Sequence, residues 1–144
     1  MNNLSSSEAE EESSEDSNPA PIIDLQDPWK IKKVITDFEQ SSKILVLPSP
    51  DIFRHVFRHW LDGMIEILNK GMKQQIILWD LTEENDPRKC GRAYVQKMKP
   101  SMDYALVCAD LFINHELNDG DHIGLYWDTI ACDFKFKLIE KGLF

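Results

Sequence analysis

Apolar and polar residues alternate in short segments along most of this chain, which is the pattern of an all-β protein. In segment 122–128, the side chains of Ile123, Leu125 and Trp127 fall on one face of a strand, and segment 133–138 alternates in the same way. Eight such segments separated by polar breaks predict a barrel or a sandwich. The other six candidate strands are Trp29–Ile35, Ile44–Leu47, Met64–Leu68, Gln75–Leu81, Arg92–Gln96 and Tyr104–Val107.

Two helices are predicted between these strands. The first is capped by Ser49, has Pro50 in its first turn and ends before Gly63. The second is short, with Asp110 as its cap and an end near Glu116. Positions with spacings of three and four residues give the first helix one apolar face, made of Phe53, Val56, Phe57, Trp60 and Leu61.

The first 26 residues have a different composition from the rest. They are rich in Ser and Glu, and residues 1–25 carry seven acidic residues and no Lys or Arg. So little apolar surface cannot offset the backbone entropy lost on folding, so we predict a disordered acidic tail, either solubilising or binding a partner. Residues 27–141 form the predicted domain. Residues 28–144 hold 17 acidic and all 16 basic residues, so this body is nearly neutral although the chain has a net charge of −9.

Several classes of protein are excluded by what the sequence lacks. No run of 18 apolar residues is present, and the polar, acidic N-terminus does not resemble a secretory signal, so we expect no membrane association. Three cysteines without a signal indicate reduced thiols. No phosphate-binding loop or dinucleotide fingerprint occurs, and we expect neither a cofactor nor enzymatic activity.

His55 and His59 are four residues apart, a spacing that suits a metal site on a helix. The sequence offers no obvious third ligand nearby, and Arg54 and Arg58 would repel a cation. We therefore interpret this segment as a solvated helix face and predict no metal site.

Lysines occur in two polar segments that lie before predicted strands. Lys43 follows residues 36–42, and Lys97 and Lys99 precede Tyr104. If the two loops lie at one end of a β-barrel, their lysines can straddle a phosphodiester backbone. The alternative is that they are ordinary solvated side chains.

The order of these motifs resembles the plant-specific B3 DNA-binding domain, in particular small plant proteins with a single divergent copy. The resemblance covers about residues 27–140. It depends most on Asp27–Lys33 (DPWKIKK) and on Gly120–Asp128 (GDHIGLYWD), with Leu45–Pro48 (LVLP) and Asp103–Val107 (DYALV) at corresponding positions.

The resemblance implies a mainly β fold, a seven-stranded open barrel with two short helices. It also implies two DNA-binding arms: an N-arm at Thr36–Lys43 and a C-arm at Gln96–Asp103. On this basis Lys33, Lys43, Lys97 and Lys99 are expected to neutralise phosphates, and Gln40, Ser41, Ser42 and Ser101 to meet base edges or backbone oxygens. Asp37 and Glu39 would place two carboxylates in the N-arm, where they would repel a polyanion.

The function implied is that of a nuclear transcription regulator that binds double-stranded DNA in the major groove, with other transcription proteins as further candidate partners. The alternative is a protein-interaction module on the same fold that has little affinity for DNA.

Overall fold

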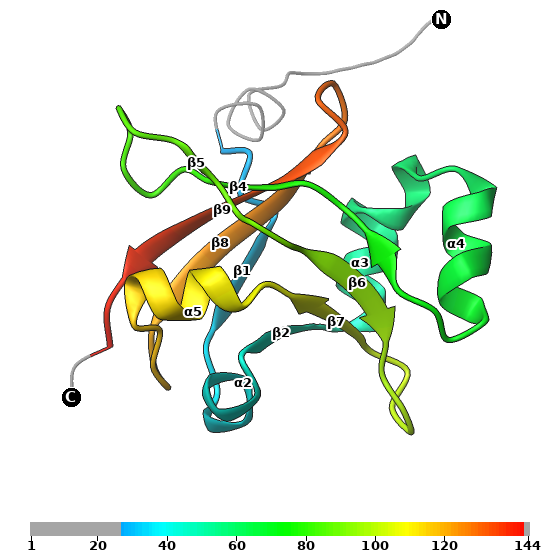
Figure 1. Ribbon diagram of the computed structural model, residues 1–144, viewed down its shortest axis with the longest axis horizontal. Helices are drawn as coiled ribbons and strands as arrows, with labels where there is room; N and C mark the ends of the chain where they lie inside the picture. Colours follow the sequence, from blue (N-terminus) through cyan, green and yellow to red (C-terminus); the bar gives the residue numbers. More distant parts are fainter. Residues whose placement is uncertain (1–26, 143–144) are drawn as a thin grey trace, which may run out of the picture.

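The computed structural model describes residues 27–142, so the predicted acidic tail lies outside the described residues. Two sheets make up most of it, one in the order β1-β8-β9-β4-β5 and one in the order β2-β7-β6-β3 (Figure 1). Neighbouring strands are antiparallel except for β4 and β9, which are parallel. The strands are β1 (Ile31–Val34), β2 (Ile44–Leu47), β3 (Gln74–Gln75), β4 (Leu78–Asp80), β5 (Arg88–Lys89), β6 (Tyr94–Lys97), β7 (Tyr104–Val107), β8 (His122–Asp128) and β9 (Asp133–Glu140).

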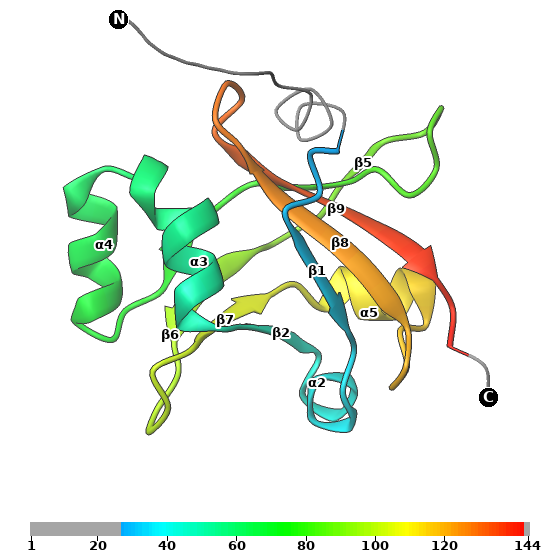
Figure 2. The ribbon, with the colours of Figure 1, turned by 180° about the vertical axis from the view of Figure 1, so that it is seen from behind.

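Short helices lie at both ends of the sheets. Figures 1 and 2, which view the molecule from opposite sides, show α3 and α4 grouped at one end and α5 at the other. Among residues 27–142 no helix has the length and apolar character needed to cross a membrane. The helices are α2 (Asp37–Ser42), α3 (Ser49–His55), the 3-10 helix η1 (Phe57–His59), α4 (Asp62–Asn69) and α5 (Ala109–His115).

The two C-terminal strands follow the predicted alternation. Ile123 and Leu125 of β8, and Phe134 and Phe136 of β9, are each at most 1% exposed and belong to the main apolar core. Burying a side chain of this size contributes about 1.5–3 kcal/mol. The register pairs Leu125 with Phe136, so the apolar faces of both strands lie on the same side of their sheet.

Two predicted strands are wrong. Residues 64–68 belong to helix α4, because Met64, Ile65 and Leu68 also fit a helical face, and that face packs on the core. The segment 75–81 does not form one strand. It passes from one sheet to the other, so that β3 pairs with β6 and β4 pairs with β9.

The predicted first helix is also divided. Its geometry breaks at Val56 and at Trp60, which is extended, giving α3, η1 and α4 in succession. Phe53, expected on the apolar face, is 48% exposed. The second predicted helix matches α5 to within one residue, but its N-cap is Cys108, and Asp110 instead accepts a hydrogen bond from the Gly91 backbone N–H.

The mainly β fold class is confirmed, while the details of the expected barrel are not. The sheets are not closed into a barrel, and in the described residues they hold nine strands where seven were expected. Four α-helices and one 3-10 helix occur in the same residues, where two helices were expected.

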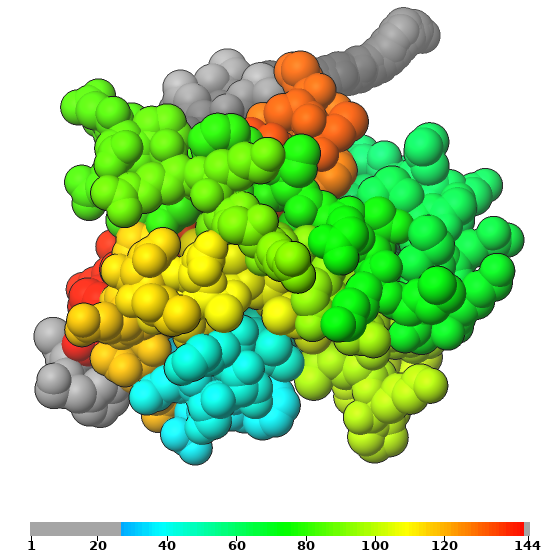
Figure 3. Space-filling view, in the orientation of Figure 1, coloured from blue at the N-terminus to red at the C-terminus, as the bar shows by residue number. Residues whose placement is uncertain are grey.

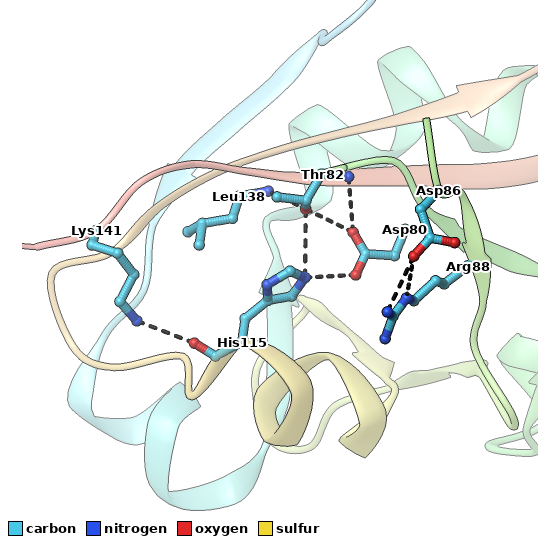
Figure 4. A network of polar contacts seen from close by, with 7 residues as sticks. All are labelled: Asp80, Thr82, Asp86, Arg88, His115, Leu138 and Lys141. Carbon is cyan, nitrogen blue, oxygen red and sulfur yellow. Dashed lines mark hydrogen bonds and ion pairs between the residues drawn. The ribbon is translucent and has the colours of Figure 1, made fainter. Parts of the chain in front are cut away.

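A polar network attaches α5 to the larger sheet (Figure 4). His115 Nε2 lies 2.5 Å from Asp80 Oδ2, and the other Asp80 oxygen accepts hydrogen bonds from the Thr82 backbone N–H and hydroxyl, at 3.0 and 2.7 Å. The Thr82 hydroxyl oxygen in turn accepts a hydrogen bond from the Leu138 backbone N–H, at 3.0 Å. This network therefore joins α5, β4 and β9 through one hydroxyl and one carboxylate.

Replacing Thr82 with valine keeps the shape of the side chain and removes the hydroxyl. The Leu138 N–H then loses its acceptor and Asp80 loses a donor, so we expect Thr82→Val to lower the free energy of unfolding by about 1–3 kcal/mol in urea denaturation. The matched control is Thr129→Val, at an exposed position, for which we expect a change below about 0.5 kcal/mol. Equal effects of the two substitutions would contradict this role for Thr82.

Candidate nucleic-acid interface

The predicted N-arm is not a loop, because most of it folds into helix α2. Thr36 and Glu39 form a capping box: the Glu39 backbone N–H donates to Thr36 Oγ1 at 3.2 Å, and the Thr36 backbone N–H donates to Glu39 Oε1 at 2.9 Å. Lys43 ends the helix in the left-handed conformation (φ 59°), and its N–H donates to the Glu39 carbonyl at 2.8 Å. The sequence signal for this helix, which we missed, is the Thr-x-x-Glu capping box of Thr36 and Glu39.

Glu39 does not face solvent, so the expectation that it repels a polyanion is wrong. Its side chain is fully buried, pairs with the Lys33 ammonium group and accepts a hydrogen bond from the Val46 backbone N–H at 2.7 Å. These contacts fix α2 between β1 and β2. They also give Lys33, whose side chain is 17% exposed, an internal partner.

The remaining N-arm residues point mainly outward. Ser41, Ser42 and Lys43 are exposed, as is Phe38, an aromatic side chain that we did not predict as a site residue and that is 54% exposed. Gln40 is half-buried, and its side-chain oxygen accepts a hydrogen bond from the Asp119 backbone N–H at 2.8 Å. That bond attaches α2 to the turn before β8.

The same turn is fixed by Asp121, which is 1% exposed. Its carboxylate accepts hydrogen bonds from the backbone N–H groups of Asn118 (2.8 Å) and Gly142 (2.7 Å) and from the Lys141 ammonium group (2.7 Å). Burial by itself raises the pKa of Asp121, but these three donors outweigh burial, and the pKa is lowered. The support beneath α2 is therefore held by an ionised carboxylate.

The C-arm is the connection between β6 and β7, and it is folded on itself. The Met98 N–H donates to the Asp103 carbonyl at 2.9 Å, and the Asp103 N–H donates to Ser101 Oγ at 3.2 Å. The arm is also attached to the start of α3, because Ser49 donates its backbone N–H to the Asp103 carboxylate and its hydroxyl to the Met102 carbonyl. Lys99, Ser101 and Met102 are exposed, and Met102 is 66% exposed.

The base of the C-arm lies against the turn after α4. The Gln96 side-chain amide donates to the Gly71 carbonyl at 3.1 Å, and the Lys99 ammonium group lies beside Gly71. Lys97 is the last residue of β6 and is half-buried. Among residues 27–142, neither Lys97 nor Lys43 forms a salt bridge, so both ammonium groups remain available to an anion.

The two arms project from the same side of the molecule. Figures 1 and 2 show α2 and the connection between β6 and β7 extending beyond the same edge, and Figure 3 shows a recess between them. The register places the bases of the two arms at the two ends of β2. α2 precedes Ile44, which pairs with Val107, and the C-arm precedes Tyr104, which pairs with Leu47 at the other end of β2. The arms therefore flank β2, whose length sets their bases roughly 10 Å apart.

Two of the three cysteines lie next to each other in the core. Cys90 and Cys108 are buried, and the adjacent Cys108 thiol together with burial raises the pKa of Cys90. Cys132 is exposed, and its thiol contacts the Thr129 carbonyl at 3.7 Å.

His55 and His59 are not on one helix, since α3 ends at His55 and His59 belongs to η1. In the part of the chain that the structure describes, no group of three or more His, Cys, Asp or Glu side chains is placed to hold a metal ion. Both histidines instead line an open cleft together with Arg54 and Arg58.

The fold and the two arms place this chain in a class of small, mainly β domains that present two polar projections on one side. The chain belongs to the B3 domain family, because a family model described as "B3 domain-containing protein At5g26805, C-terminal domain" matches residues 29–139. The family resemblance predicted from the sequence is thus confirmed.

One curated relative is similar to this chain in sequence, and one solved structure is similar to it in fold. The B3 domain-containing protein At1g10455 of Arabidopsis thaliana is 28% identical over 116 residues, which cover 77% of this chain and 70% of the relative. The structure titled "Arabidopsis FUS3-DNA complex" has a TM-score of 0.54 and 20% identity, and the match covers 79% of this chain and 98% of that one. At that identity the structure supports the fold.

The buried Glu39 predicts that α2 depends on one carboxylate. We expect Glu39→Ala to lower the free energy of unfolding by about 3–5 kcal/mol, because it leaves Lys33 without its counter-charge and the Val46 N–H without an acceptor. The control is Asp37→Asn, also in the first turn of α2 but exposed, for which we expect a loss of about 0.3–1 kcal/mol. Urea denaturation measures both, and similar losses would contradict the special role of Glu39.

Proposed function

We propose that this protein is a plant transcription regulator that binds double-stranded DNA in the major groove through the N-arm and the C-arm. The observation that carries the proposal is the projection of both arms from one side of the domain (Figures 1 and 2). Their bases are roughly 10 Å apart along β2, which is comparable to the width of about 12 Å of the major groove of B-DNA. The FUS3 structure is a complex with DNA, which supports DNA as the partner in this proposal.

In this proposal, six of the predicted residues contact DNA directly and two position the N-arm. Lys43, Lys97 and Lys99 neutralise phosphates, and Ser41, Ser42 and Ser101 donate to base edges or backbone oxygens. Lys33 and Gln40 contribute mainly by positioning the N-arm, because each already has an internal partner.

Two apolar side chains extend the proposed interface. Phe38 of the N-arm and Met102 of the C-arm are 54% and 66% exposed. Apolar side chains in the major groove contact the methyl group of thymine, so we propose that Phe38 and Met102 contact thymine methyl groups.

The proposed location in the nucleus follows from DNA as the partner.

A selection from a random pool of double-stranded oligonucleotides, followed by a mobility-shift titration with the full chain, tests the proposal. Enrichment of a common sequence that binds the chain supports it. Absence of any DNA binding contradicts it and favours the protein-interaction module instead. Asp37 and Asp119, which expose carboxylates on and beside α2, would favour that alternative.

Removing the C-arm lysines separates phosphate contacts from sequence recognition. We expect Lys97→Ala with Lys99→Ala to weaken binding to all DNA sequences at least tenfold, because two phosphate contacts are lost. We also expect the slope of log affinity against log salt concentration to fall by about two units. Filter binding between about 50 and 200 mM salt measures both effects.

The matched control removes two basic side chains elsewhere in the domain. Arg88→Ala with Lys89→Ala changes exposed residues of β5, on the side of the molecule away from the arms (Figure 1). This variant is expected to keep the affinity and the slope of the unmodified chain. If both double variants lose affinity equally, the C-arm assignment is wrong.

A further inference from the structure

An open cleft of about 670 Å³ lies between α3, η1 and the hairpin that joins β8 to β9. It is at the opposite end of β1 from the N-arm, since Lys30 precedes β1 and α2 follows it (Figures 1 and 2). We call it the basic cleft and define it by Lys30, Arg54, His55, Arg58, Trp127 and Ile130. Neither the family resemblance nor the proposed DNA interface uses it.

The charge of the cleft is positive. Arg54 and Arg58 are exposed and form no salt bridge with a described residue. The acidic side chain that lines the cleft is Asp128. Its carboxylate accepts hydrogen bonds from the Ile130 and Ala131 N–H groups, both at 3.0 Å, and lies 3.5 Å from the Lys135 ammonium group, which compensates part of its charge.

His55 adds little positive charge at neutral pH. Burial lowers its pKa and outweighs the nearby carboxylate of Asp51, which acts to raise it. Arg54, Lys30 and Arg58 also lower the pKa of His55 through their own charges. The attraction of the cleft for anions therefore comes mainly from Arg54 and Arg58.

The cleft also has an apolar side. Trp127 is half-buried on one wall, and Ile130 at the tip of the hairpin is 95% exposed. A ligand that fits both sides carries several negative charges together with apolar residues. An acidic peptide has this composition, whereas a free phosphate would use only the basic side.

The N-terminal segment of the same chain has that composition. Residues 8–16 contain six acidic residues, and residues 19–25 contain Pro19, Pro21, Ile22 and Ile23. The described part of the chain begins at Asp27, and Pro28 already lines the cleft. The thirteen residues from Asp16 to Pro28 span at most roughly 40 Å when extended, so the acidic residues are within reach.

We propose that the acidic segment of residues 8–25 binds the basic cleft of its own chain. Covalent attachment close to the cleft gives the segment an effective concentration in the millimolar range, so that weak individual ion pairs are sufficient. Because the ion pairs are at the surface, binding weakens as salt rises. Bound in this way, the acidic residues are held at the end of the domain away from the arms.

Paramagnetic relaxation in the full chain tests this proposal. A nitroxide label is attached at Ser13→Cys, with the exposed Cys132 replaced as Cys132→Ser, since Cys90 and Cys108 are buried. We expect broadening of the backbone amide signals of residues 54–59 and 126–130, and little broadening in the arms. Raising the salt concentration to about 0.5 M is expected to remove most of it.

Two charge-reversal variants of the labelled chain provide the comparison. Arg54→Glu with Arg58→Glu is expected to abolish the broadening, whereas the matched control Arg88→Glu with Lys89→Glu is expected to retain it. Well-dispersed amide spectra establish that both variants are folded, and the salt titration of the unreversed chain gives a second readout if the first does not fold.

Three results would overturn the proposal. The first is broadening centred on the arms, and the second is broadening that neither salt nor Arg54→Glu with Arg58→Glu reduces. The third is equal broadening in a mixture of spin-labelled chains with separate, isotope-labelled chains, which would assign the contact to a second copy. No DNA is present, so the outcome is independent of the proposed DNA binding.

Discussion

The buried carboxylate of Glu39 is the interaction on which the geometry of the candidate interface depends. Through the Lys33 ammonium group it holds β1, and through the Val46 N–H it holds β2, while its own helix supplies the capping box with Thr36. β1 and β2 belong to different sheets. One side chain therefore fixes the position of the N-arm relative to both sheets.

The C-arm is fixed by the same kind of contact at the other end of β2. The Asp103 carboxylate and the Met102 carbonyl accept hydrogen bonds from Ser49, which directly follows the connection from β2. Gln96 attaches the base of the arm to the turn after α4. Both arms are thus pre-positioned by polar contacts to their own scaffold, which reduces the conformational entropy that binding a partner would remove.

The sequence predicted best where one face of a strand is buried. In β8 and β9, alternate side chains face the core and the others lie on the opposite face of the sheet. The alternation of apolar and polar residues is therefore enough to predict these strands. The strand predicted at residues 64–68 is wrong, because five residues that are mostly apolar fit a strand and a helix equally well. Which of the two forms is decided by packing of α4 on the core, which the segment itself does not encode.

The two arm segments were expected on one edge of the domain, where Figures 1 and 2 show them, while the role of single residues was harder to infer. Glu39 was interpreted as a surface charge because an acidic residue in a polar segment is normally exposed. Only the folded structure shows that α2 turns it toward Lys33 and Val46. The Thr36–Glu39 capping box was the local signal that α2 forms, and with it the inward direction of Glu39 becomes predictable.

Inward-facing carboxylates also reduce the negative charge that this nearly neutral domain presents at its surface. The four buried acidic residues of the described chain each contact a basic side chain: Glu39 with Lys33, Asp80 with His115, Asp121 with Lys141, and Asp133 with Lys135. Lys43, Lys97 and Lys99 have no such partner among those residues. Because a charge at the surface is screened within about 8 Å in physiological salt, an approaching polyanion responds to these local groups. The net charge of the chain is therefore a poor guide to what the arms attract.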